Sequence, residues 1–140
     1  FLVLLPLAFV VAVLFVIGGM PMTLNGAAQA TTLEGATQTI ARGPVAAFVA
    51  IKQLGPNGGG FFGPNSTHPF ENPSMFTNIV SMFSILTIPM ACVWMFGRIT
   101  GRMGHAAVVF GVMLMLILGK IAWSVSMEST PTQAFIGLPV

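Results

Sequence analysis

The residues best suited to chemistry are three consecutive glycines, Gly58-Gly59-Gly60, which follow Asn57 and precede two phenylalanines. Glycine adopts backbone angles of either sign, so successive carbonyl oxygens can turn toward one axis. A row of such oxygens can replace the hydration shell of a cation, as in a selectivity filter. A flexible linker or a phosphate loop are the alternatives, although a phosphate loop needs Gly-Lys-Ser/Thr after its glycines, which this sequence lacks.

Three other polar residues surround this run in the sequence. His68 and Glu71 could be two metal ligands, but a metal site needs three or four, and we expect them instead to brace the strand that leaves the glycines. Lys52 is expected to point away from the glycine axis, toward a carboxylate supplied by another repeat or subunit. The sequence has no aspartate, and we predict no catalytic residue and no further metal site.

The composition shows which kind of protein must position these residues. Of the 140 residues, 55% are hydrophobic and 6% are charged, whereas a soluble domain carries about 25% charged residues. Five basic residues are too few for a phosphate-tracking patch, so we expect no nucleic acid partner. These values disfavour a soluble enzyme and three buried helices of a soluble core, and they predict a membrane protein in contact with lipid.

Three apolar spans are long enough to cross a hydrocarbon core of about 30 Å as helices. They cover residues 1–22, 73–97 and 106–127. For the second span, Asn72 is predicted as the N-cap with Pro73 at the first helical position. The connection 98–105 holds Arg98 and Arg102 and no acid, so the positive-inside rule places it in the cytoplasm. The segment 23–72 between the first two spans and the segment 128–140, where the sequence stops, are then external.

A shorter apolar stretch lies inside the first external segment. Residues 44–54 predict a helix of about 16 Å, half a bilayer, which can only dip into the membrane and return. The return, residues 55–60, is the predicted filter, and the polar part 24–39 is predicted as an outer loop. The fold class that follows is an all-α membrane protein. It has a repeat over 1–97, made of a transmembrane helix, a re-entrant pore helix with its filter loop and a second transmembrane helix, and then one further transmembrane helix.

Several motifs of this sequence closely resemble the potassium-binding subunit of the potassium-transporting ATPase, the KdpA family. They are Thr31-Thr32-Leu33-Glu34-Gly35, Gly43-Pro44-Val45-Ala46, Ala50-Ile51-Lys52, Leu54–Phe62, Asn65-Ser66 and His68-Pro69-Phe70-Glu71-Asn72-Pro73. The resemblance covers nearly the whole chain, but the chain spans only about a quarter of the family's length. It resembles the family's second helix–loop–helix repeat followed by the first helix of the third repeat. Pro56 departs from the family pattern, which has threonine there, as does the Gly63-Pro64 pair.

The resemblance implies a channel-like subunit that binds external K⁺ and passes it to a P-type ATPase subunit. It implies that Asn57, Gly58, Gly59 and Gly60 form the potassium filter and that Asn65 lies near its outer mouth. It also implies a small accessory subunit of the Kdp complex, no covalent cofactor, and a multi-pass location in a bacterial or archaeal cell (inner) membrane. The alternative is a small membrane-embedded structural or assembly subunit that conducts no ion and whose glycines only permit tight packing.

Overall fold

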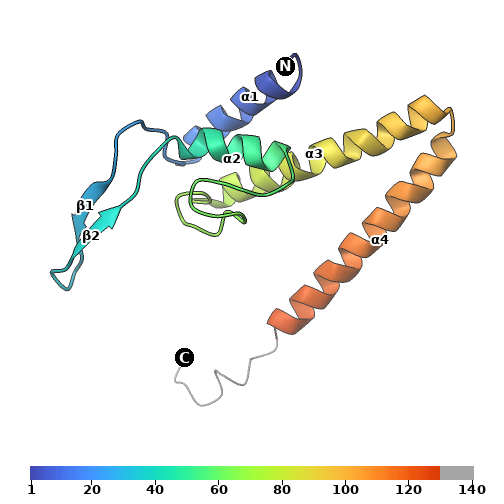
Figure 1. Cartoon of the computed structure of the whole chain (residues 1–140). Helices are drawn as coiled ribbons and strands as arrows, with labels where there is room; N and C mark the ends of the chain where they lie inside the picture. The colour runs from blue at the N-terminus through green and yellow to red at the C-terminus, as the bar shows by residue number, and fades with distance from the viewer. Residues whose placement is uncertain (130–140) are drawn as a thin grey trace. The chain divides into compact units, whose positions relative to one another are not determined.

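The computed structural model describes residues 1–129 and is mostly helical (Figure 1). The elements in chain order are α1 (Leu4–Ile17), β1 (Ala28–Thr31), β2 (Thr37–Ile40), α2 (Val45–Leu54), α3 (Met75–Thr100) and α4 (Met103–Glu128). The chain divides into two compact units, residues 1–89 and residues from 90 onward. The predicted external segment 128–140 lies, apart from its first two residues, outside the described residues.

The core of the first unit lies between α1 and α2. Val11 and Phe15 of α1 are buried, together with Met20 after that helix. The facing side of α2 contributes Val45, Ala46, Val49, Ala50 and Leu54. The amide of Ala46 donates a hydrogen bond of 3.1 Å to the carbonyl oxygen of Pro21, which fixes the start of α2 beside the end of α1. This packing holds α2 in place under the loop that follows it.

α1 is shorter than the predicted span of residues 1–22. It has 14 residues, about 21 Å at the usual rise, because Gly19 ends it with a φ of 97°. The amide of Gly19 donates to the Val16 carbonyl, and that of Met20 donates to the Phe15 carbonyl. These two bonds form a Schellman motif, which stops a helix and turns the chain.

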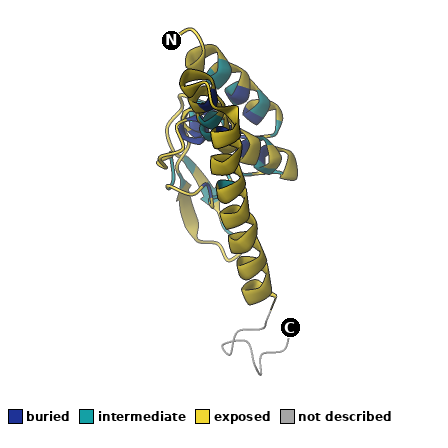
Figure 2. Ribbon diagram, turned by 90° about the vertical axis from the view of Figure 1, so that its right-hand side faces the viewer, coloured by how far each residue is buried: buried dark blue, intermediate teal, exposed yellow. Residues whose placement is uncertain are grey.

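α3 and α4 are the two described helices that are long and apolar enough to cross a membrane. Each has 26 residues, and their most apolar windows have mean hydropathies of 2.0 and 2.2. Figure 2 shows α4 exposed along nearly its whole length, and Ala106 is its one buried residue. An exposed apolar helix of this kind is stable in lipid, where its backbone groups are satisfied within the helix.

The start of α3 differs from the prediction, because Ser74 and not Asn72 occupies the N-cap. The Ser74 hydroxyl accepts a hydrogen bond of 3.3 Å from the Thr77 amide, and the Thr77 hydroxyl accepts one of 3.1 Å from the Ser74 amide. This reciprocal pair satisfies two amides at the helix start, as in a capping box. Ser74 also donates to the Gly18 carbonyl, which ties α3 to the end of α1.

The connection between α3 and α4 is shorter than the predicted segment 98–105. Only Gly101 and Arg102 separate the two helices, and Arg98 lies in the last turn of α3. Gly101 has a φ of 65°, a left-handed conformation that glycine adopts without steric cost. The tight turn is therefore made at this glycine, with Arg98 before it and Arg102 directly after it.

A β-hairpin replaces part of the predicted outer loop 24–39. β1 and β2 pair antiparallel, with Ala28 opposite Ile40 and Thr31 opposite Thr37. The turn uses Gly35, whose φ is 84°, and the amide of Ala36 donates to the Thr32 hydroxyl. The described chain is therefore mostly helical but not all-α.

Candidate functional site

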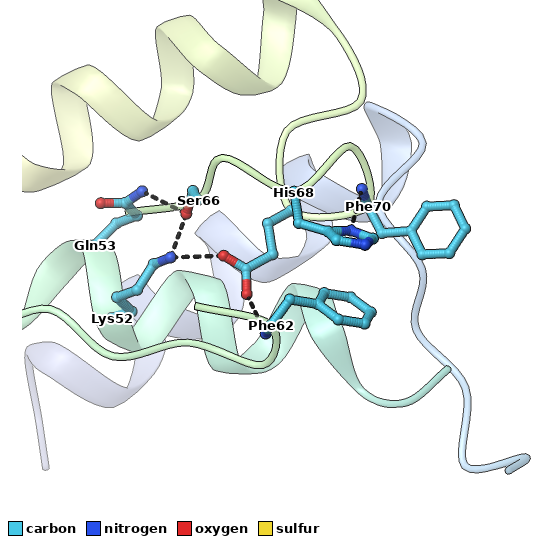
Figure 3. Close-up of polar contacts among 7 residues, drawn as sticks. Lys52, Gln53, Phe62, Ser66, His68 and Phe70 are labelled. Atoms are coloured by element: carbon cyan, nitrogen blue, oxygen red, sulfur yellow. Dashed lines mark hydrogen bonds and ion pairs between the residues drawn. The ribbon is translucent and has the colours of Figure 1, made fainter. Parts of the chain in front are cut away.

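The last turn of α2 and the loop that follows it form a buried polar network (Figure 3). The ammonium of Lys52 lies 2.8 Å from Oε2 of Glu71 and also donates a hydrogen bond to the Ser66 hydroxyl. The Gln53 amide nitrogen donates to the same hydroxyl over 3.4 Å. The side chains of Lys52 and Glu71 are 4% and 0% exposed, so this ion pair is shielded from solvent and holds the loop onto α2.

Glu71 uses its second oxygen to hold the strand that leaves the glycines. Its Oε1 accepts a hydrogen bond of 2.7 Å from the Phe62 amide. Burial raises the pKa of the Glu71 carboxyl, but hydrogen bonds from Lys52 and the Phe62 amide, with the Lys52 charge, outweigh burial and lower that pKa below its usual value. Glu71 is therefore ionised at neutral pH and acts on both α2 and residue 62.

These contacts test two predictions made from the sequence, one for Glu71 and one for Lys52. The predicted bracing role of Glu71 is confirmed by its bond to the Phe62 amide. The expectation for Lys52 is wrong in both respects. Its carboxylate partner is Glu71 of the loop that follows α2 and not a group of another repeat or subunit, and its ammonium lies beside Gly60, 2.9 Å from the position of a Cβ there, and not away from the glycines. The loop after α2 brings residue 71 back to that helix, and the pairing compensates a buried charge that would otherwise be unpaired.

Aromatic rings hold the loop from the other side. The rings of Phe62 and His68 stack with centroids 4.0 Å apart, and Nδ1 of His68 accepts a hydrogen bond of 3.2 Å from the Phe70 amide. Phe61 packs edge-on against both Phe62 and Phe48 of α2. His68 is thus occupied in bracing, and within residues 1–129 no three His, Cys, Asp or Glu side chains gather as metal ligands would.

The glycine run needs glycine for two different reasons. Gly58 and Gly59 have φ values of 82° and 93°, in the left-handed region that residues with a Cβ rarely adopt. At Gly60 the reason is space, because a Cβ would lie 2.5 Å from the Gly63 carbonyl oxygen and 2.9 Å from both Lys52 Nζ and Glu71 Oε1. The backbone of the run therefore packs directly onto the ion pair.

The predicted site residues occupy two places in the structure. Asn57, Gly58, Gly59 and Gly60 are exposed along one continuous stretch. Asn65 is also exposed, but it lines a hollow of about 250 Å³ together with Gln53 and Ser66. The lining of that hollow contains none of residues 57–60, so the structure does not bring Asn65 into one pocket with the glycines.

Two residues of the network were not identified from the sequence, Gln53 and Ser66. Ser66 is buried and has a φ of 51°, which no residue-type pattern reveals. A signal for the ion pair itself did exist. The sequence has only three carboxylate side chains, at Glu34, Glu71 and Glu128, and a lysine inside an apolar helix must have a partner if it is buried.

The chain is similar to known proteins along nearly its whole length. The family model described as potassium-transporting ATPase A subunit, KdpA, matches residues 1–137. Two curated relatives from Leptospira interrogans serogroup Icterohaemorrhagiae, one from serovar copenhageni and one from serovar Lai, are each named potassium-transporting ATPase potassium-binding subunit. Each is 50% identical over 137 residues, which cover 96% of this chain and 25% of the relative. The chain thus spans about a quarter of the length of these relatives.

Proposed function

Because the chain belongs to the family of potassium-transporting ATPase A subunits, KdpA, we propose that it contributes residues 55–60 to a filter that binds potassium. The observation that carries this proposal is the run Gly58-Gly59-Gly60, whose first two members have left-handed φ values. The relatives that share half of its residues are named potassium-binding subunits. Asn57 and the three glycines supply backbone carbonyls to the ion, and Asn65 belongs to the outer approach.

The chemistry of this loop suits a monovalent cation. Neutral carbonyl oxygens replace the hydration shell of K⁺ without the cost of stripping a tightly held divalent shell. The C-terminal end of α2 precedes the loop, and the negative end of a helix dipole favours a cation nearby. The loop is held by Glu71 at the Phe62 amide and by stacked rings, so the carbonyls are oriented before the ion arrives.

The membrane setting belongs to the same proposal. α2 has 10 residues, about 15 Å, which is half of a bilayer core, and we place it as a re-entrant pore helix between the spans of a helix–loop–helix repeat. Irregular backbone at that depth requires surrounding protein or a water-filled cavity. Other repeats of the full-length subunit must therefore complete the filter around residues 55–60.

The partners follow from the family and not from any group in this chain. We propose that the subunit works in a Kdp complex in a bacterial or archaeal cell (inner) membrane, spans that membrane several times and contacts its lipid. A P-type ATPase subunit receives the potassium and hydrolyses ATP, a small accessory subunit completes the complex, and this subunit has no catalytic role and no covalent cofactor. The alternative is a structural or assembly subunit without ion conduction, which leaves the left-handed glycines and their brace without a purpose.

The test compares two glycines of the loop in the complete transport complex. A Cβ at either Gly59 or Gly63 meets nothing within 4 Å, but only Gly59 has a φ in the left-handed region, 93°. Gly59→Ala must shift the backbone, at a cost of about 1–2 kcal/mol, and so re-aim the carbonyls. We expect it to raise the potassium concentration for half-maximal uptake into proteoliposomes, while Gly63→Ala leaves that concentration unchanged. Equal effects of the two changes would contradict the filter proposal.

A further inference from the structure

The buried ion pair lies against the proposed filter and not merely beneath the loop. The position of a Cβ on Gly60 is 2.9 Å from the Lys52 ammonium and 2.9 Å from Oε1 of Glu71. Both charges belong to side chains that are almost fully buried. Gly60 is one of the four residues whose carbonyls are proposed to bind the ion, so one full positive and one full negative charge lie beside the proposed ion site.

Each of these charges alone would have a strong effect on a bound cation. Unit charges that lie a few ångströms apart near a protein surface interact by several kcal/mol at an effective dielectric constant of about 20. A solitary Lys52 ammonium would repel the cation, whereas the ion pair with Glu71 has no net charge. The affinity for the cation should therefore differ by about tenfold or more between a site beside an unpaired Lys52 and a site beside the neutral ion pair.

We propose that Glu71 sets the affinity of the glycine run for potassium by cancelling the charge of Lys52 beside Gly60. This inference rests on the proposed function of residues 55–60. Glu71 acts through Lys52 and does not touch the ion, so it is a positioning residue with an electrostatic effect. Lys52 in turn fixes Glu71, and the pair contributes structure to the loop without adding net charge to it.

The two roles of Glu71 can be separated by substitution. Its Oε1 accepts the Phe62 amide hydrogen while its Oε2 faces Lys52. Glu71→Gln keeps an acceptor for the Phe62 amide, but it removes the charge and replaces the oxygen that accepts from Lys52 with an amide NH2 group. Lys52→Met keeps most of the apolar stem and removes the ammonium, and the double variant has neither charge. The three variants therefore change the charge beside Gly60 in three different ways.

The experiment measures the potassium concentration for half-maximal uptake by the complete complex carrying each variant. We expect Glu71→Gln to raise that concentration about tenfold or more, because it leaves Lys52 unpaired. Lys52→Met is expected to leave it unchanged or to lower it, since the remaining carboxylate attracts a cation when ionised and is neutral when protonated. The double variant Lys52→Met with Glu71→Gln is expected to return to the wild-type value.

A purely structural role gives a different pattern. It predicts that both single variants raise the half-maximal concentration alike and that the double variant is no better than either, and this result would overturn the inference. If Glu71→Gln does not assemble, because a lone buried charge is destabilising, the double variant decides: wild-type affinity supports the inference and weakened affinity contradicts it. If Gly59→Ala leaves the potassium concentration for half-maximal uptake unchanged, that result would instead refute the filter proposal itself.

Discussion

Gly43 is buried because the ring of Phe61 occupies the space that a side chain at residue 43 would take. The contact joins Gly43, two residues before α2, to the residue just after the glycine run. Phe61 is also held by the rings of Phe48 and Phe62. At this scale the loop is a set of close contacts in which glycines at residues 43 and 60 make room for an aromatic ring and an ion pair.

A single added methyl group tests the contact at Gly43. We expect Gly43→Ala to destabilise the subunit by about 1–3 kcal/mol, as overpacking usually does, because its Cβ overlaps the Phe61 ring. Gly26→Ala is the matched control, since a Cβ there meets nothing within 4 Å. Thermal melting of the detergent-solubilised complex measures both, and a Gly43→Ala melting temperature equal to that of Gly26→Ala would refute this packing.

Residue types predicted that the glycine run can adopt backbone angles closed to other residues, and they predicted the bracing role of Glu71. They did not predict the partner of Lys52. The sequence shows that a lysine lies in an apolar stretch, yet the carboxylate is 19 residues away in a loop whose path depends on aromatic packing. The part played by Ser66 depends on its left-handed backbone. Such contacts result from tertiary structure, so a residue-by-residue reading of the chain could not supply them.

At the scale of elements, the apolar runs indicated where helices lie, and the differences arise at their ends. α1 stops at Ile17 because Gly19 adopts a left-handed conformation, although the apolar run continues past it. The β-hairpin was missed because β1 and β2 are rich in threonine and glutamine and have no buried apolar face. The alternation of apolar and polar residues that predicts a strand is present in β1 over four residues only and is absent from β2.

The orientation of these elements in the membrane is a prediction that single cysteines can test. Arg98 and Arg102 flank the α3–α4 turn, so we expect this turn to be cytoplasmic and the β1–β2 hairpin to be external. In a Cys92→Ala background, a cysteine at Thr100 should react with an impermeant thiol reagent from the inside only, and one at Thr37 from the outside only. The reversed pattern would contradict this orientation.

At the scale of the whole molecule, many large apolar side chains of the described residues are exposed. The most apolar windows of α3 and α4 are only 11% and 6% buried within the structure, and α1 and α2 border an apolar groove that includes Phe9 and Ile51. The chain spans a quarter of the length of its relatives. Under the proposed function we expect lipid and other repeats of the subunit to contact these apolar helices, and no pattern within 140 residues predicts how such contacts are arranged.

The most direct test of the filter is to locate the ion in the complete complex. Crystals grown with rubidium in place of potassium give an anomalous signal that marks the position of the bound cation. We predict a peak in contact with the backbone carbonyl oxygens of residues 57–60, beside the Lys52–Glu71 ion pair and at a point where other repeats of the full-length subunit also contribute oxygens. A well-occupied rubidium peak elsewhere in the subunit, with none touching residues 57–60, would contradict the account.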